Sequence, residues 1–153
     1  MSTTVAAYGV QTPTAPVAQL SIERRDPGPR DVLIKIDFCG ICHSDIHHAR
    51  GDWGDQYYPA VTGHEIVGHV AAVGPEVTKH QVGDVVGVGC MVDSCRTCDQ
   101  CQAGQEQYCL NGNTGTYGSP DKDGTYTKGG YSQTVVVDQD FVVKVPAGLD
   151  LAA

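Results

Sequence analysis

Four of the seven cysteines lie close together in the segment CRTCDQCQAGQEQYC, where they are Cys95, Cys98, Cys101 and Cys109. Two overlapping Cys-x2-Cys steps and a fourth thiol eight residues later suit one tetrahedral Zn²⁺ ion, because each short loop returns the next sulfur to the same side. Four thiolates fill the coordination sphere, so we expect this zinc to be structural. Buried or disulfide-linked cysteines and an iron–sulfur cluster are the alternatives.

Two other segments, CGICHSDIHH and GHEIVGHV, carry further side chains that ligate metals. Cys42 and His64 are separated by 22 positions, and that spacing alone does not place them in one site. The residues that surround each of them in the sequence change this interpretation.

Short runs rich in Val and Ile, separated by Gly, Pro, Asp or Asn, predict a mainly β fold. The predicted strands are residues 4–10, 19–24, 32–38, 65–73, 82–88, 132–137 and 141–145. One short helix is predicted at residues 44–50, with Ser44 or Asp45 as its N-cap. The stretch 90–128 has no apolar periodicity, so we expect a metal to order it.

Charge and composition exclude several classes of protein. The formal net charge of −8 argues against nucleic acid or an anionic membrane surface as a partner, since both attract basic faces. No run of about 18 apolar residues is present, and no basic and apolar leader opens the sequence. Because cysteines without a secretion signal favour metal binding over disulfides, we expect a cytoplasmic protein.

The segment GHEIVGHVAAVGPEV, residues 63–77, matches the pattern G-H-E-x2-G-x5-G-x2-V at every fixed position. This pattern is the signature of the zinc-containing alcohol dehydrogenases, which the chain therefore resembles. The GICHSD segment, the four cysteines and GDVVGVGC follow the order of that family. The sequences of the segments YYPAVTGHE, VGCMVDSC and GGYSQTVVV resemble those of its cinnamyl-alcohol-dehydrogenase-like branch, which usually prefers NADP. The resemblance implies a GroES-like β-barrel domain with short helices and a zinc-bound loop lobe at about residues 90–128.

The resemblance also implies an open metal site. Cys42 and His64 correspond to two protein ligands of the catalytic zinc, and Glu65 corresponds to the carboxylate that can approach the ion during ligand exchange. Three protein ligands leave a fourth position for water or substrate, whose pKa the metal lowers. Asp45 is expected to orient one of the metal ligands without binding the metal itself.

Four more residues receive roles only from this resemblance. Ser44 and His47 correspond to a proton relay, which suits histidine because its ordinary pKa is near 6.5. Without the resemblance, they would be interpreted as a helix cap and a surface histidine. His43 corresponds to a position that faces the cofactor pyrophosphate, and Trp53 to one that lines the alcohol pocket, although loop packing is an equal alternative for Trp53. Cys39 and Cys90 are expected to be small buried apolar residues.

Two parts of the family pattern are not found in the sequence. The third catalytic-zinc ligand of the family lies beyond Ala153, and no G-x-G-x-x-G segment follows a predicted strand. We therefore expect one catalytic domain over residues 1–153, without the Rossmann domain that binds NADP or NAD. We expect the isolated chain to be inactive, and the full-length enzyme to be a homo-oligomer that converts a primary, possibly aromatic, alcohol to its aldehyde reversibly.

Three other functions are alternatives for this sequence. A GroES-like zinc-binding structural or interaction module would need no catalysis, but it would have no use for a Cys/His site beside a serine and a histidine. A zinc ribbon that binds nucleic acid is disfavoured because Arg96 is the single basic residue between Cys95 and Cys109. A quinone reductase of the same superfamily would usually lack both zinc sites.

Overall fold

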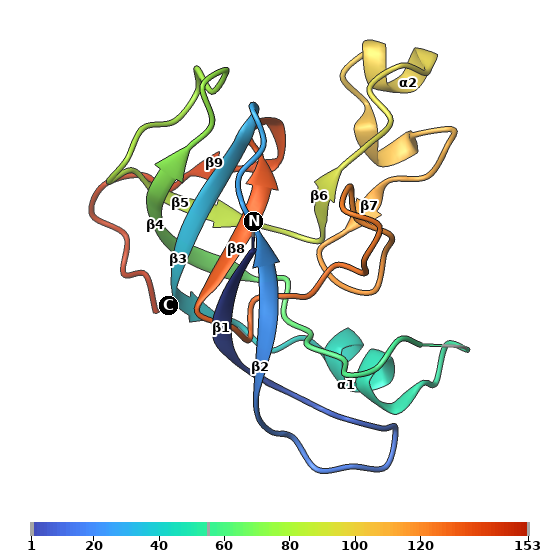
Figure 1. Ribbon diagram of the computed structural model, residues 1–153. Coiled ribbons are helices and arrows are strands. Elements are labelled where there is room, and N and C mark those ends of the chain that lie inside the picture. The colour runs from blue at the N-terminus through green and yellow to red at the C-terminus, as the bar shows by residue number, and fades with distance from the viewer. Residues whose placement is uncertain (1, 55, 153) are drawn as a thin grey trace.

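The computed structural model describes residues 2–54 and 56–152. Its main element is an antiparallel sheet of five strands in the order β8-β3-β4-β5-β9 (Figure 1). These strands are β3 (Asp31–Cys39), β4 (Ile66–Val73), β5 (Val85–Val88), β8 (Thr134–Asp138) and β9 (Val143–Lys144).

One face of this sheet forms the main hydrophobic core. Val32 and Ile34 of β3 and Val86 of β5 have no exposed surface, because alternate side chains of a strand point to the same face. Two register shifts between β3 and β4 increase the local twist, which curves the sheet around its core. The buried members of the core are Val32, Ile34, Ile66, Val70, Val86, Val88, Val92, Val135, Val137 and Val142.

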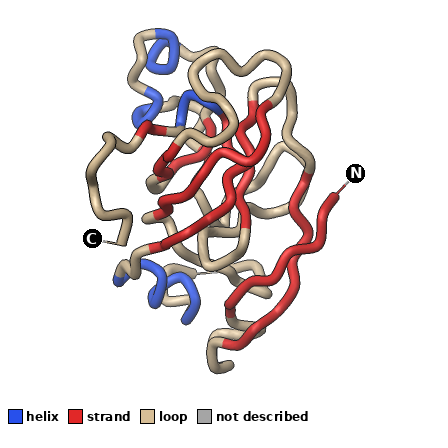
Figure 2. The backbone as a smooth tube through the Cα atoms, turned by 90° about the vertical axis from the view of Figure 1, so that its left-hand side faces the viewer, coloured by secondary structure: helices blue, strands red, loops and turns tan. Residues whose placement is uncertain are grey.

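The strands β1 (Ser2–Gly9) and β2 (Ala18–Arg25) form a hairpin beside the sheet (Figure 2). Val5, Ala7 and Ile22 of the hairpin pack with Val61 in a smaller hydrophobic core. The hairpin is tied to the segment before β8, where the Tyr8 amide donates to the Tyr131 carbonyl at 2.8 Å. The hairpin and the sheet together form the curved β structure that carries the rest of the molecule.

The stretch 90–128, here called the four-cysteine lobe, projects from the sheet (Figure 1). It contains β6 (Met91–Asp93), α2 (Asp99–Gln102), a 3-10 turn (Glu106–Tyr108) and β7 (Thr114–Gly115). The buried apolar side chains that the structure describes in this lobe are Val92 and Cys101. The lobe therefore has no apolar core of its own within the described residues.

Ion pairs attach the lobe to the sheet. The Arg96 Nη2 atom lies 2.8 Å from the Asp138 Oδ1 atom, and the Arg96 guanidinium lies 4.9 Å above the Phe141 ring. The Lys122 Nζ atom lies 2.8 Å from the Asp93 Oδ2 atom and 3.6 Å from the Asp31 Oδ1 atom. Because Asp31 and Asp138 are almost fully buried, these charges need partners. The lobe supplies one partner to each of them, in addition to Arg25 beside Asp31 and Arg30 beside Asp138.

The predicted secondary structure differs from the observed one in three places. All seven predicted strands exist, but the last one is reduced to β9 by a preceding 3-10 turn, Gln139–Phe141. The helix α1 (His43–Arg50) has Cys42 as its N-cap, and neither Ser44 nor Asp45 occupies that position. Asp45 is the third helical residue and accepts a hydrogen bond from the Cys42 amide at 2.9 Å, as in a capping box.

The third difference concerns elements that the sequence analysis missed. β6, β7 and α2 lie in the lobe, where their few residues carry no periodicity. The expectation of a buried Cys90 is wrong, since that residue is exposed, whereas Cys39 is half-buried. No helix among residues 2–54 and 56–152 is long and apolar enough to cross a membrane.

Candidate metal centres

The four lobe cysteines converge as their spacing predicts. Their sulfur atoms lie within 4.8 Å of one another, and all four thiols are free. The Cys98 and Cys101 sulfurs are 3.5 Å apart, and the Cys95 and Cys101 sulfurs are 3.8 Å apart. A tetrahedron with Zn–S bonds of about 2.3 Å has edges of about 3.8 Å. The cluster therefore fits one zinc ion and leaves no room for several iron atoms.

Backbone amides of the lobe point at these sulfurs. The Cys98 amide donates to the Cys95 sulfur at 3.4 Å, and the Leu110 amide donates to the Cys98 sulfur at 3.4 Å. Amide hydrogen bonds from Thr97 and Cys98 lower the pKa of the Cys95 thiol to about 5. Hydrogen bonds to its sulfur also lower the pKa of Cys98, and since zinc binds the thiolate form, these bonds favour metal binding at Cys95 and Cys98.

A second group of ligand atoms forms where two distant segments meet. Cys42, His64 and Glu65 each place a ligand atom within 4.8 Å of the other two. Cys42 is the N-cap of α1, whereas His64 and Glu65 end the loop that leads into β4. A thiolate, an imidazole and a carboxylate are all ligands that zinc accepts, and three of them leave its fourth position free.

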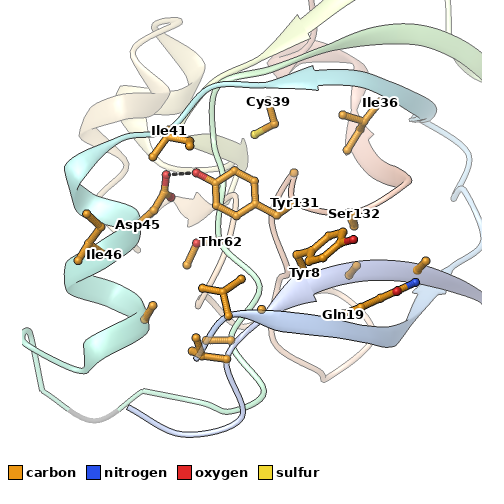
Figure 3. A pocket seen from close by; sticks show the side chains of 18 of the residues that line it. Tyr8, Gln19, Ile36, Cys39, Ile41, Asp45, Ile46, Thr62, Tyr131 and Ser132 are labelled. Atoms are coloured by element: carbon orange, nitrogen blue, oxygen red, sulfur yellow. Dashed lines mark hydrogen bonds between the residues drawn. The ribbon is translucent and has the colours of Figure 1, made fainter. Parts of the chain in front are cut away.

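A buried carboxylate ties these two segments together. The Asp45 side chain is 3% exposed, and it accepts from the Cys42 amide at 2.9 Å and from the Gly63 amide at 2.9 Å. The Tyr131 hydroxyl donates to the same carboxylate at 2.7 Å (Figure 3). Burial alone would raise the pKa of Asp45, but hydrogen bonds from Tyr131, Cys42 and Gly63 lower it below its usual range. Asp45 thus acts on the ligands through their backbone.

Gly63 is required by the same arrangement. Its φ of +98° lies in the left-handed region, and a Cβ atom there would lie 2.8 Å from the Cys39 sulfur and 2.9 Å from the Tyr131 ring. A larger residue would displace His64, which follows it directly. This explains in physical terms why glycine precedes the histidine in the segment GHE.

The predicted relay residues lie on one side of α1. His47 is one helical turn beyond Ser44, and its Nδ1 atom lies 2.8 Å from the Asp52 Oδ2 atom. Among the described residues no hydrogen bond joins Ser44 to His47. The His43 ring stacks on the His47 ring at 4.7 Å, so all three predicted residues of this helix share one region.

Trp53 lies beside this relay. Its ring centroid is 5.2 Å from that of His47, and the side chain is 60% exposed. The structure therefore places the tryptophan near the predicted site, at the surface of the described chain.

Tyr117 is a neighbour of the site that the sequence analysis missed. Its hydroxyl donates to the Ser44 Oγ atom at 3.3 Å, and its ring lies parallel to the His64 ring at 5.5 Å. Burial raises the pKa of Tyr117 above its usual range, so the phenol remains a hydrogen-bond donor. Tyr131 was missed as well, although both tyrosines stand beside glycines in GTYGS and GGYS, which is a weak signal.

A cavity of about 880 Å³ has Asp45 in its lining (Figure 3). It is bounded by the β1–β2 hairpin, the end of β3, α1 and the segment 130–133, and its lining includes Ile36, Ile41 and Ile46. Cys42, His64 and Glu65 do not line it. We assign the chemistry to the metal-ligating group because the donor set, and not the volume, determines what can react.

Comparison with known proteins identifies the family. The profile of the alcohol dehydrogenase GroES-like domain matches residues 28–147. The chain belongs to this family. The GroES-like fold inferred from the sequence is therefore confirmed, as is the resemblance to zinc-type alcohol dehydrogenases.

Relatives of known name support the same assignment. The chain is 56% identical over 152 residues to NADP-dependent alcohol dehydrogenase C of Mycobacterium tuberculosis, covering 98% of the chain and 44% of that protein. It is 49% identical over 142 residues to aldehyde reductase YahK of Escherichia coli, covering 92% of the chain and 40% of that protein. The chain thus spans less than half the length of these relatives.

Solved structures agree with the relatives. The crystal structure of CAD from Helicobacter pylori complexed with NADP(H) matches with a TM-score of 0.93 and 40% identity, covering 99% of this chain and 44% of that one. A cinnamyl alcohol dehydrogenase from Sorghum bicolor matches with a TM-score of 0.92 and 46% identity, covering 97% of this chain and 42% of that one. The predicted likeness to the cinnamyl-alcohol-dehydrogenase-like branch is confirmed.

Proposed function

We propose that residues 1–153 form the catalytic domain of a zinc-dependent alcohol dehydrogenase that interconverts a primary alcohol and its aldehyde with NADP. The observation that carries this proposal is the convergence of Cys42, His64 and Glu65 from two separate segments, next to the Ser44 hydroxyl. A structural or interaction module has no need for an incomplete ligand set. Because the chain spans 44% of its first relatives, the activity is proposed for the whole enzyme to which this domain corresponds.

Two zinc sites with different roles are part of the proposal. Cys95, Cys98, Cys101 and Cys109 hold a structural ion in the lobe at residues 90–128. Cys42 and His64 hold the catalytic ion, with Glu65 within reach as a further ligand. When bound, the catalytic zinc lowers the pKa of the alcohol, and NADP accepts the hydride.

The chain's own residues handle the proton. The Ser44 hydroxyl takes the proton from the alcohol, and His47 passes it to solvent, because its imidazole is half-exposed. Asp52 accepts from the His47 Nδ1 atom and holds the ring in one orientation. No direct hydrogen bond joins Ser44 to His47 among the described residues, so the proposed transfer would need a bridging group, such as a water molecule, between them.

The remaining site residues are proposed to bind the reactants. His43 begins α1, where the helix dipole and free amides favour the anionic cofactor pyrophosphate. Trp53, which packs beside His47, is proposed to contact the alcohol through its aromatic ring. We propose a cytoplasmic setting because six half-buried or exposed thiols and one buried thiol, all free, persist in reducing compartments.

Zinc content tests the proposal. Plasma mass spectrometry on the purified chain is expected to give two zinc ions per chain, and Cys42→Ser is expected to reduce this to one. Cys39→Ser is the matched control, since Cys39 is a free, half-buried thiol three residues away that belongs to neither ligand group. The control is expected to retain two zinc ions. One zinc ion per chain, unchanged by Cys42→Ser, would contradict the proposed catalytic site.

A further inference from the structure

A side chain from the four-cysteine lobe reaches into the proposed catalytic site. The Tyr117 ring lies parallel to the His64 ring, with 5.5 Å between centroids and 5° between planes. The Tyr117 hydroxyl donates to the Ser44 Oγ atom at 3.3 Å. One side chain therefore contacts a proposed metal ligand and the proposed proton acceptor at the same time.

The backbone on both sides of Tyr117 is firmly held. Thr116 is 2% exposed, its amide donates to the Cys90 carbonyl at 3.1 Å, and its hydroxyl donates to the Gly89 carbonyl at 2.5 Å. The Gly118 amide donates to the Thr127 carbonyl at 2.9 Å. The two bonds of Thr116 attach this segment to the connection between β5 and β6, which precedes Cys95, and the Gly118 bond attaches it to Thr127 at the end of the lobe.

The tyrosine ring is also confined by its surroundings. The edge of the buried His48 ring meets it, with 4.8 Å between centroids. A Cβ atom on Gly118 would lie 2.2 Å from the His48 Cε1 atom, so the chain passes closely over that imidazole. Contacts with His48 and His64 together restrict the positions that the Tyr117 ring can occupy.

The hydrogen bond to Ser44 has a chemical consequence. A serine hydroxyl has one proton to donate and two lone pairs that accept. When Tyr117 donates to one lone pair, the other lone pair remains for the proton of the alcohol, and the serine proton remains for the next member of the relay. The phenol thus sets the direction in which Ser44 can transfer a proton.

We propose that Tyr117 is a positioning residue through which the four-cysteine lobe orients both Ser44 and His64. This inference rests on the proposed function, because it assigns Tyr117 to the same site. It gives the structural zinc lobe a second role, since the fold of the lobe determines where the tyrosine lies.

The first test separates the ring from the hydroxyl. Tyr117→Leu removes the ring beside His64 together with the hydroxyl, which faces Asp45 as well as Ser44. Tyr117→Phe keeps the ring against His64 and loses only the hydroxyl, so it is the control for the contact with Asp45. Tyr126→Leu is the matched control, because Tyr126 is a half-buried tyrosine of the same lobe that stacks on Tyr57, at 3.3 Å, and contacts neither Ser44 nor His64. Backbone amide NMR spectra show that each variant is folded.

The readout for His64 is its Cε1–Hε1 NMR signal in the chain whose lobe already holds zinc. Tyr117→Leu is expected to move this signal, because the ring current of the tyrosine is lost. The same variant is expected to raise the dissociation constant for a second Zn²⁺ ion, bound at Cys42 and His64, about tenfold or more. Tyr117→Phe and Tyr126→Leu are expected to leave the signal in place and the dissociation constant within about twofold of the parent value.

The readout for Ser44 is the ¹³Cζ signal of Tyr117, which reports whether the phenol donates a hydrogen bond. Ser44→Ala is expected to shift this signal and to leave the Tyr126 signal unchanged. If Tyr117→Leu leaves His64 and its zinc affinity unaltered, or Tyr126→Leu alters them equally, the positioning role is wrong. If the parent His64 signal does not respond to Zn²⁺ at all, the proposed function fails and this inference fails with it.

Discussion

Different forces stabilise the β-sheet and the four-cysteine lobe internally, although the two regions belong to one domain. The sheet buries a row of valines and isoleucines, among them Val32 and Ile34 with no exposed surface. The lobe buries two apolar side chains, Val92 and Cys101, and is organised instead by four converging thiols and by ion pairs. Apolar burial stabilises the first region, and we expect metal binding by the four thiols to order the second.

This difference determines how each region contributes to the proposed site. The sheet supplies the end of β3, which precedes Cys42, and the start of β4, which follows Glu65. The lobe supplies Tyr117, which contacts Ser44 and His64. The site therefore lies where a metal-independent region meets a region that we expect to depend on its metal.

The largest expected effect is the loss of local structure when the lobe loses its zinc. Cys101→Ser removes the buried member of the four-thiol cluster, and metal binding provides most of the free energy that folds such loops, about 10–16 kcal/mol for small zinc domains. Amide hydrogen exchange in residues 94–112 is expected to approach the rate of an unstructured chain, whereas amides of β3 and β4 keep their protection.

The control for this change is Cys90→Ser, which alters an exposed thiol outside both ligand groups. Its exchange pattern is expected to match that of the parent chain. Equal loss of protection in the lobe and in the sheet of the Cys101→Ser variant would show that the two regions fold as one unit.

A smaller effect is expected from a cavity in the sheet. Ile34→Ala removes a fully buried side chain and is expected to lower the free energy of unfolding by about 2–5 kcal/mol, measured by denaturant titration. The affinity of the lobe for zinc is expected to stay unchanged, because Ile34 does not belong to the lobe. Ile41→Ala, which truncates a side chain that is 80% exposed, is expected to change stability by less than about 0.5 kcal/mol.

The smallest effect concerns the ion pairs of Asp140, of which the pair with Arg96 joins the sheet to the lobe. The Asp140 carboxylate lies 2.6 Å from the Lys79 Nζ atom and 2.7 Å from the Arg30 Nη2 atom, and it also pairs with Arg96. Burial opposes its ionisation, but hydrogen bonds from Lys79 and Arg96 lower the pKa of Asp140 to about 2, from an ordinary value of 3.8. Its contribution to stability is therefore complete above pH 3.8 and is lost as the pH falls toward 2.

Asp140→Asn tests this pH dependence. The variant is expected to unfold roughly 2–8 °C below the parent chain at pH 7 and at pH 4, and this difference is expected to narrow at pH 3. Glu76→Gln, which changes an exposed carboxylate outside these ion pairs, serves as the control in the same thermal scans. A difference that stays constant from pH 7 to pH 3 would show that the charge of Asp140 does not stabilise the folded chain.

Much of the fold could be predicted from local sequence, and the exceptions have local causes. Valine-rich runs predicted all the strands of the sheet, because strand preference and burial act together there. β6 and β7 were missed, since two or three residues cannot show a period of two. The N-cap of α1 was misplaced because the side chain of Asp45 reaches back to the Cys42 amide.

The sequence by itself determined that the four cysteines of the lobe could come together. Cys95 to Cys109 lie within one short loop, so their spacing alone predicts the cluster of sulfurs that the structure shows. Only the tertiary structure decided that Cys42 meets His64, that Asp45 holds both segments, and that Tyr117 reaches them. These contacts join residues far apart in the chain, and their distances depend on how the sheet curves and where the lobe attaches.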